Sequence, residues 1–376
     1  MDFDYSEEQR LLDETVRRLV KDEYEFSARK KYLEEPQGFS AALWAKYAEL
    51  GLLGLPFAEE YGGFGGGGIE TMIVMEAFGR GLALEPYLAT VVLGGGLVAL
   101  AGTDGQKSAI LPEIAAGNLK LAFAQSERQA RYDLAHVETR AKPQGGGFAL
   151  NGHKSVVLHG GSAHKLIVSA RVGGNVNDAS GISLFLVDRD AKGVTARDFP
   201  TVDGLRAADV TLANVAVGGD ALLGPRDGAL PLIVRAVDRA VAALCAEAVG
   251  IMETLNAMTL DYIKTRKQFS VAIGSFQVLQ HRMVDMTIAA EQAKSLEVFA
   301  AMSIDSDDQR ERERAVSAAK VQIGQSGRFV GQQAIQLHGG IGMTDEYAAG
   351  HYFKRLSTIE HTFGDTDYHL DRFPAF

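Results

Sequence analysis

The feature that most constrains the fold is a set of three long helical segments in the last third of the chain. Residues 237–265, 276–302 and 309–337 are each predicted to form one helix, and a shorter helix is predicted over 346–360. Helices of this length bury their apolar faces against one another. We therefore expect a four-helix bundle over residues 229–376.

The first part of the chain, residues 1–118, is also predicted to be helical. Ser6 and Gln9 have the spacing of a capping box, and the residues after them form an apolar helical stripe of Leu11, Leu12, Val16 and Leu19. Further helices are predicted over 39–50, 69–79 and 106–116. Gly51 and Pro56 end the first of these, because glycine favours a helix C-cap and proline cannot continue a helix.

The middle part, residues 119–228, has the pattern of a β domain. The stretch 148–154 is predicted to be a hairpin that turns at Asn151-Gly152. Short β-prone runs follow over 166–170, 182–187 and 194–196, separated by Gly, Asn and Asp. Strands at this spacing are typical of a β-barrel or sandwich. The predicted fold class is therefore α+β, with a helical, a β and a second helical domain in that order.

Composition limits the partners of this chain. The net charge of −10 argues against nucleic acid and anionic membrane, because both require a basic face. The longest uncharged run, 86–103, contains three consecutive glycines and is too short to span a membrane. Cys245 is the only cysteine, so no internal disulfide can form, and the acidic first residues do not resemble a targeting peptide. We expect a cytoplasmic protein.

Three other kinds of site are poorly supported by the sequence. Residues 63–68 fit GxGxxG, but no strand precedes them, so a turn between helices is expected instead of a dinucleotide site. His159-Gly160-Gly161 is similar to an esterase oxyanion loop, yet the chain has no GxSxG motif. No metal site is expected, because no HxxxH pair or nearby cysteine accompanies the histidines at positions 136, 153, 159 and 164.

The end of the chain carries the most specific motif. QLHGGIGMT at residues 336–344, followed by FGDT at 363–366, resembles the closing signature of the flavin-dependent acyl-CoA dehydrogenases. The phrases at 50–56 and 59–63 match the N-terminal part of that family, and the resemblance covers nearly the whole chain. It implies the acyl-CoA dehydrogenase fold, FAD as cofactor, an acyl-CoA thioester as substrate and electron-transferring flavoprotein as redox partner.

The resemblance also implies a set of FAD-binding residues. In the family, a loop and a glycine turn of one subunit hold the diphosphate and adenine of the neighbour's FAD; their counterparts here are Arg266, Phe269, Gln277, Gln336, Gly339 and Gly340. An arginine fork suits phosphate, and glycines let a diphosphate approach the backbone. Toward the flavin ring, the matching residues are Phe123, Gln125, Ser126, which keeps a hydroxyl, and Thr366.

The chain departs from the family where the chemistry takes place. Gly364 stands at the position of the glutamate base, and Ala240 stands at the alternative base position. Val156 and Leu158 replace the tryptophan and threonine that contact the flavin ring. Asp365 is the remaining candidate base, and its alternative role is that of a helix cap or a solvated aspartate. Glu247 and Glu360 are expected on the surface or in salt bridges.

These departures resemble the small subunit of pimeloyl-CoA-type dehydrogenases, which form α2β2 heterotetramers. In such assemblies one subunit supplies the base, and the other contributes the fold and the loop that binds the neighbour's FAD. The alternatives are a homotetramer that uses an unusual base such as Asp365, and a non-catalytic structural subunit.

Overall fold

The computed structural model describes residues 4–373, which form two compact units. The bundle unit contains Met1–Lys31, Gly67–Ala83 and Val241–Phe376, and the sheet unit contains Tyr32–Gly66 and Leu84–Ala240. The chain therefore enters each unit more than once. The division into 1–118, 119–228 and 229–376 remains a proposal.

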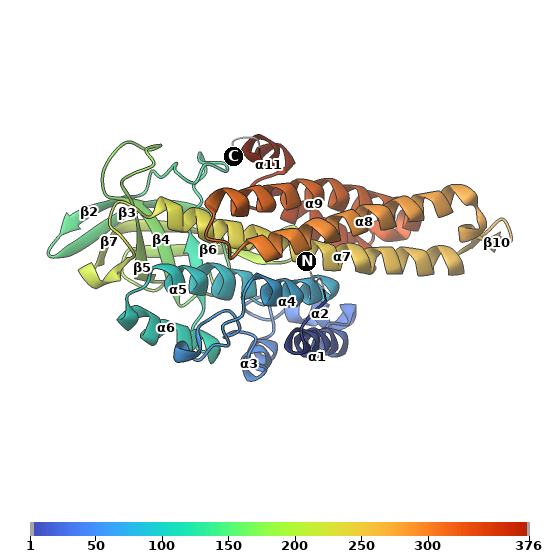
Figure 1. The fold of residues 1–376 in the computed structure, drawn as a ribbon, viewed down its shortest axis with the longest axis horizontal. Helices are drawn as coiled ribbons and strands as arrows, with labels where there is room; N and C mark the ends of the chain where they lie inside the picture. Colours follow the sequence, from blue (N-terminus) through green and yellow to red (C-terminus); the bar gives the residue numbers. More distant parts are fainter. Residues whose placement is uncertain (1–3, 374–376) are drawn as a thin grey trace. The chain divides into compact units, whose positions relative to one another are not determined.

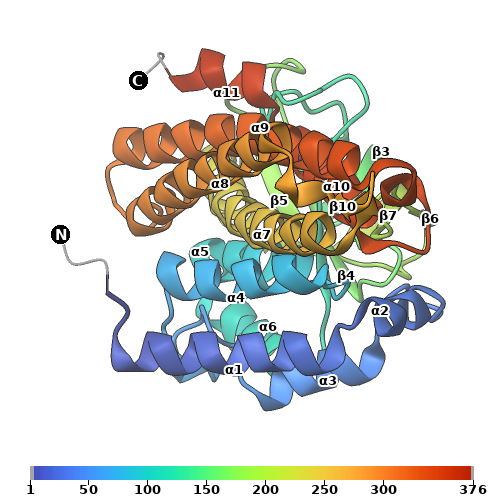
Figure 2. The same ribbon diagram turned by 90° about the vertical axis from the view of Figure 1, so that its right-hand side faces the viewer.

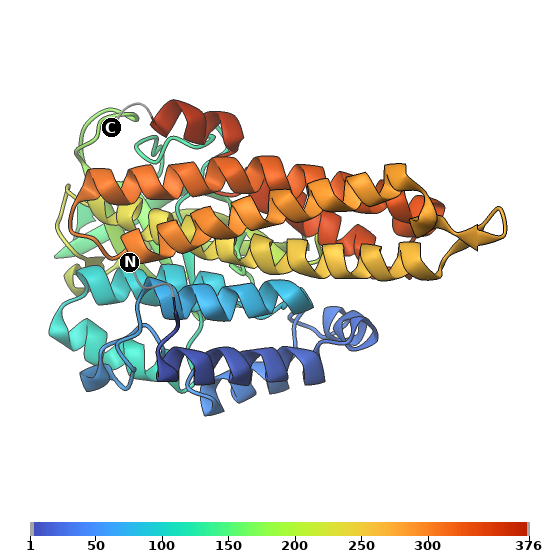
Figure 3. The ribbon, with the colours of Figure 1, turned by 45° about the vertical axis from the view of Figure 1, so that its right-hand side comes forward.

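The bundle unit is built from long helices. Its elements are α1 (Glu7–Glu23), α2 (Phe26–Leu33), α4 (Gly68–Gly81), α7 (Leu230–Thr265, in this unit from Val241), β9 (Lys267–Gln268), β10 (Val271–Ala272), α8 (Gln277–Ser303), α9 (Gln309–His338), α10 (Ala348–His361) and α11 (Thr366–Arg372). In Figures 1 and 3, α8 and α9 run side by side along α7, and the β9–β10 hairpin projects from the end that α7 and α8 share. The long predicted helices are confirmed, as is the capping box of Ser6 and Gln9.

Glycine and buried charge hold these helices together. A Cβ atom on Gly79 would lie 2.0 Å from the carbonyl oxygen of Glu247, and one on Gly250 equally close to that of Glu76, so α4 and α7 cross in backbone contact. Viewed along the bundle in Figure 2, α4 lies between α1 and α7. Only glycine allows this approach.

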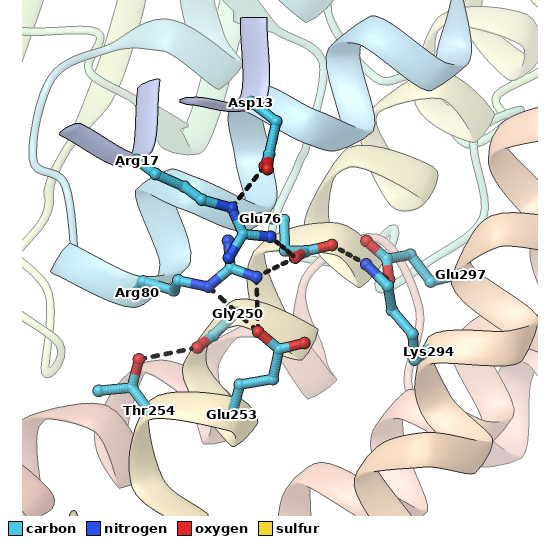
Figure 4. A network of polar contacts seen from close by, with 9 residues as sticks. All are labelled: Asp13, Arg17, Glu76, Arg80, Gly250, Glu253, Thr254, Lys294 and Glu297. Carbon is cyan, nitrogen blue, oxygen red and sulfur yellow. Dashed lines mark hydrogen bonds and ion pairs between the residues drawn. The ribbon is translucent and has the colours of Figure 1, made fainter. Parts of the chain in front are cut away.

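A polar network around the buried Glu76 joins α1, α4, α7 and α8 within the bundle unit (Figure 4). Glu76 accepts hydrogen bonds from Arg80 and Lys294, and Arg80 also binds Glu253, with Nη2 2.5 Å from Oε2. Burial would raise the pKa of Glu76, but Lys294 and Arg80 outweigh it and hold that pKa below its usual range. The network thus fixes helices that are far apart in sequence.

The sheet unit combines short helices with a twisted sheet. Its helical elements are α3 (Ala41–Glu49), a π-helix (Leu88–Gly95), α5 (Gly96–Ala101) and α6 (Asp104–Ala115). The strands are β1 (Leu121–Ala124), β2 (Arg140–Gln144), β3 (Gly147–Leu158), β4 (Lys165–Arg171), β5 (Ile182–Asp188), β6 (Val194–Pro200), β7 (Arg206–Val217) and β8 (Leu222–Leu223). They are ordered β6-β7-β3-β2-β4-β5-β8, and β1 pairs in parallel with β4.

The hairpin predicted at Asn151-Gly152 is wrong. β3 runs straight through both residues, and the chain reverses earlier, at Gly145 and Gly146, which both have positive φ. Asn151 lies at a register shift between β3 and β7, where its Oδ1 accepts a hydrogen bond from the Asn214 amide at 2.9 Å. Gly152 is needed for close packing instead of a turn, since its Cβ would lie 2.3 Å from Oγ1 of Thr139.

Residues 63–67 form a loop before α4, with no strand in front of them, as predicted. Among residues 4–373, no helix combines the length and the apolar character that crossing a membrane requires.

Candidate functional site

Arg266 and Phe269 lie on the hairpin that projects from the bundle unit. Arg266 directly follows α7, and both Phe269 and Ser270 at the hairpin tip have left-handed backbone conformations. The Phe269 ring is 88% exposed, and the Arg266 and Gln277 side chains are exposed as well. An aromatic ring held this far into solvent is a feature of binding surfaces, because burial of such a ring against a partner is strongly favourable.

Aromatic contacts bring the glycine turn to the same end of the unit. The Tyr262 ring, one turn before Arg266, lies 4.6 Å from the His338 ring, and Tyr347 lies 5.0 Å from His338, as measured between centroids. His338 is the last residue of α9, so Gly339 starts close to the end of α7. Arg282 Nη1 also donates to Gln333 Oε1 at 3.0 Å, which ties the start of α8 to α9.

The glycine turn itself has open space beside it. Gly339, with a φ of +65°, and Gly340 both have no atom within 4 Å of an added Cβ, and they are exposed together with Gln336. Open backbone beside an arginine and amide side chains suits an anionic diphosphate. The structure therefore gathers Arg266, Gln277, Gln336 and the two glycines at one end of the bundle unit.

In the sheet unit, a buried ion pair holds the segment that contains Gln125 and Ser126. Lys154 of β3 lies 2.7 Å from Glu127, and its Nζ also donates to the Gln125 carbonyl oxygen at 3.1 Å and to Ser169 Oγ at 2.9 Å. Burial lowers the pKa of Lys154 to about 8, and Glu127 offsets part of that effect. The pair anchors the end of β1, with buried Phe123, against β3.

Ser126 lies beside a strained bulge of β3. Its carbonyl oxygen accepts the Ser155 amide at 2.9 Å, and the next residue, Val156, has a φ of +52° where the register with β7 shifts. A β-branched residue with positive φ is a true outlier, and such strain gathers at functional sites. Val156 is 52% exposed, so the bulge presents an apolar surface next to the half-buried Ser126.

The structure places Asp365 at the start of α11. Its Oδ1 accepts a hydrogen bond from the Tyr368 amide at 2.9 Å, which is the geometry of an N-cap. Thr366 points back toward Glu360, with Oγ1 3.5 Å from Oε1. Asp365 therefore has the helix-capping role that was the alternative to the role of a base.

The two other carboxylates near the base position lie in ion pairs, as expected. Glu247 pairs through both oxygens with buried Arg355, at 2.5 and 2.6 Å, and Glu360 pairs with Arg328. Each of these ion pairs connects two helices of the bundle unit.

His369, a fully buried histidine in the same region, was not predicted from the sequence. Its Nε2 lies 3.1 Å from the Phe363 carbonyl oxygen and its Nδ1 3.3 Å from Ser317 Oγ. Burial, with Lys320 and Arg372 nearby, lowers the pKa of His369 to about 3. With both ring nitrogens engaged and the ring neutral, His369 cannot replace the missing base. No sequence pattern pointed to it, because a single histidine in a short helix has no motif.

Comparison with known proteins decides the family. The models of the acyl-CoA dehydrogenase N-terminal, middle and C-terminal domains match residues 6–118, 122–215 and 230–373. The probable acyl-CoA dehydrogenase YngJ of Bacillus subtilis is 30% identical over 365 residues, which is 96% of this chain and 95% of YngJ. The chain belongs to the acyl-CoA dehydrogenase family.

Solved structures agree with this membership. A variant of the steroid ACAD Tcur3481-Tcur3483 is 29% identical, with a TM-score of 0.88 over 98% of this chain and 97% of that one. The ChsE4-ChsE5 complex from Mycobacterium tuberculosis is 25% identical, with a TM-score of 0.90 over 100% and 98%. The acyl-CoA dehydrogenase fold, with helical, β and helical domains in that order, is confirmed.

FAD is the cofactor of an acyl-CoA dehydrogenase. The exposed group of Arg266, Gln277, Gln336, Gly339 and Gly340 at the end of the bundle unit, here called the cradle, fits the FAD diphosphate. Arg266 would pair with phosphate, the amides of Gln277 and Gln336 would donate to it, and Gly339 and Gly340 would let it approach the backbone. When bound, FAD supplies the acceptor for the hydride that leaves the β-carbon of the acyl group.

Proposed function

We propose that this acyl-CoA dehydrogenase chain is the base-poor, small subunit of an α2β2 heterotetramer of the pimeloyl-CoA type. One observation carries the proposal: glycine stands at the family base position, while the residues that would hold a neighbour's FAD are present and gathered at one exposed end. The chain would thus help to bind FAD without removing the proton.

The reaction itself requires a base. Dehydrogenation begins with removal of a proton α to the thioester, and a carboxylate can do this only when it is placed and desolvated for the task. Asp365 caps α11, and Glu247 and Glu360 are in ion pairs. We infer that the related large subunit supplies the base.

An exposed apolar stripe on α8 supports assembly with another chain. Val284, Ile288, Phe299 and Met302 are 56%, 50%, 42% and 38% exposed, and their spacing places them on one side of the helix. A stripe of this kind on a helix usually marks an interface. Two of the similar structures are assemblies named for two different chains, Tcur3481-Tcur3483 and ChsE4-ChsE5.

The two alternatives make different demands on the chain. In a homotetramer with an unusual base, Asp365 would have to act as the base although its Oδ1 accepts the Tyr368 amide. In a purely structural subunit, the exposed Arg266 and the open glycine turn would have no ligand. Under the main proposal, the protein acts in the cytoplasm, and electron-transferring flavoprotein reoxidises the flavin.

Co-purification tests the proposal. The chain would be expressed alone and together with a related acyl-CoA dehydrogenase chain encoded beside it, with a different affinity tag on each. We expect only the co-expressed sample to yield a flavin-loaded tetramer that carries both tags in equal amounts. A flavin-loaded tetramer of this chain alone would favour the homotetramer, and a flavin-loaded monomer would contradict the role of the Arg266 hairpin.

A further inference from the structure

The loop around Gly364 is held rigidly inside the bundle unit. Lys320 of α9 is 1% exposed, and its Nζ donates to the carbonyl oxygens of Glu360 at 3.0 Å, Thr362 at 2.9 Å and Gly364. On the other side, the His369 ring lies against the Phe363 carbonyl, and Asp365 caps α11. The backbone of this loop therefore has little freedom to move.

Two rings fill the space beside Gly364. A Cβ on Gly364 would lie 2.4 Å from Cδ1 of Tyr368 and 2.6 Å from Nε2 of His369, distances that real Cβ contacts essentially never show. The φ of Gly364 is +113°, a conformation that residues with a side chain rarely adopt.

The His369 ring cannot easily move away, whereas the Tyr368 ring is half-buried. His369 is fully buried and held between Ser317 and the Phe363 carbonyl, and Tyr368 packs edge-on against it at 5.1 Å between centroids. A side chain at position 364 would have to displace the buried His369 ring and the Tyr368 ring that packs on it, which is costly where the interior is close-packed.

We propose that Tyr368 and His369 close position 364 to every side chain, so that the family base position is locked as glycine. This steric block rests on the proposed function, in which the chain lacks the base. It adds that Gly364, Tyr368 and His369 together keep a carboxylate side chain out of the family base position. A single exchange of Gly364 for glutamate would then fail to return a base to this loop.

The contrast with other glycines provides a matched control. Gly146 also has a positive φ, +83°, but no atom lies within 4 Å of its added Cβ. Gly146→Ala therefore carries a backbone cost without a clash, whereas Gly364→Ala carries both.

A set of alanine variants, with thermal unfolding followed by circular dichroism, tests the steric block. Gly364→Ala should lower the midpoint by roughly 5 °C or more, and Gly146→Ala by less than half of that. Truncating the Tyr368 ring should relieve its part of the clash, while the His369 contact remains: measured against Tyr368→Ala alone, adding Gly364→Ala should cost clearly less than it costs in the wild type. Tyr368→Phe keeps the ring and should give no relief.

The outcomes separate the steric block from the proposed function. Equal costs of Gly364→Ala in the wild-type, Tyr368→Ala and Tyr368→Phe backgrounds would overturn the steric block. If Gly364→Ala is insoluble, soluble Gly364→Ala/Tyr368→Ala protein supports the steric block, and loss of both overturns it when Gly146→Ala remains soluble. Because unfolding is measured, this result is independent of where the catalytic base of the assembly lies.

Discussion

Glu85 in the sheet unit should make stability depend on pH in an unusual direction. Its carboxyl is 7% exposed and accepts hydrogen bonds from the Ser40 amide at 3.2 Å, the Leu84 amide at 3.3 Å and the Tyr47 hydroxyl at 3.1 Å. All three donors are neutral. Burial therefore dominates and raises the pKa of Glu85 from 4.5 to about 7, although the backbone donors at Ser40 and Leu84 lower it in part.

Proton binding determines whether stability rises or falls with pH. Between pH 4.5 and 7 the folded protein keeps the Glu85 proton while the unfolded chain has lost it, so the folded state binds more protons and stability falls as the pH rises. The full shift is worth about 3 kcal/mol, and roughly 2–3 kcal/mol of it develops between pH 5 and pH 8. Glu85→Gln removes the titration and should remove this slope.

Urea unfolding followed by the fluorescence of Trp44 measures the effect. Trp44 is the only tryptophan, and its ring lies 6.5 Å from that of Tyr47, close to the Glu85 carboxyl. Relative to the wild type, Glu85→Gln should gain about 2–3 kcal/mol in unfolding free energy from pH 5 to pH 8. The exposed Glu49→Gln serves as the control and should run parallel to the wild type. Parallel curves for Glu85→Gln as well would refute the reasoning.

Three further predictions concern the candidate site. Arg266→Ala should weaken FAD binding in the assembled protein by roughly 1.5–3 kcal/mol, the value of a charge-assisted contact, without unfolding it; an FAD dissociation constant equal to that of the wild type would be incompatible with a phosphate contact of Arg266. Lys154→Met should lower the urea-unfolding free energy by about 3–5 kcal/mol, because it leaves the Glu127 carboxylate buried and unpaired. Lys165→Met, which breaks a half-buried lysine's pair with the exposed Asp188, should cost less than about 1 kcal/mol, and equal losses would argue against the anchor. Asp365→Asn should preserve both the α11 cap and the turnover of the heterotetramer, and abolished turnover would instead identify Asp365 as a base.

The sequence predicted the helices correctly where capping residues and apolar periodicity indicate the same element. The capping box at Ser6 and the uninterrupted helical stretches of α7, α8 and α9 specify helices whatever surrounds them. Asn151-Gly152 is a strong local turn signal that tertiary contacts overrode, since Gly152 is required by its approach to Thr139. Helix α2 was not among the predicted helical segments, and a tertiary contact holds it, in which Arg29 donates to the Leu82 carbonyl oxygen at 2.9 Å.

The candidate site shows the same division. The motif predicted that Gly364 occupies the position of the family's glutamate base, because the residue type at an aligned position is given directly by the sequence. It could not predict that Tyr368 and His369 fill the vacated space, since this depends on how α11 packs against α9. Likewise, no sequence pattern predicted that Glu127 and Lys154 form a buried pair, because the two residues are far apart in the chain and only the packing of β3 brings them together.

Acyl-CoA-dependent dye reduction tests the central claim most directly. The purified chain alone, reconstituted with FAD, would be compared with the co-purified heterotetramer over straight-chain, dicarboxylic and steroid acyl-CoA thioesters. The base-poor role predicts turnover by the heterotetramer and little or none by the lone chain. Robust turnover by the lone chain would contradict it: loss of that turnover in Asp365→Asn would establish the homotetramer, and survival in Asp365→Asn would require a base elsewhere in the chain.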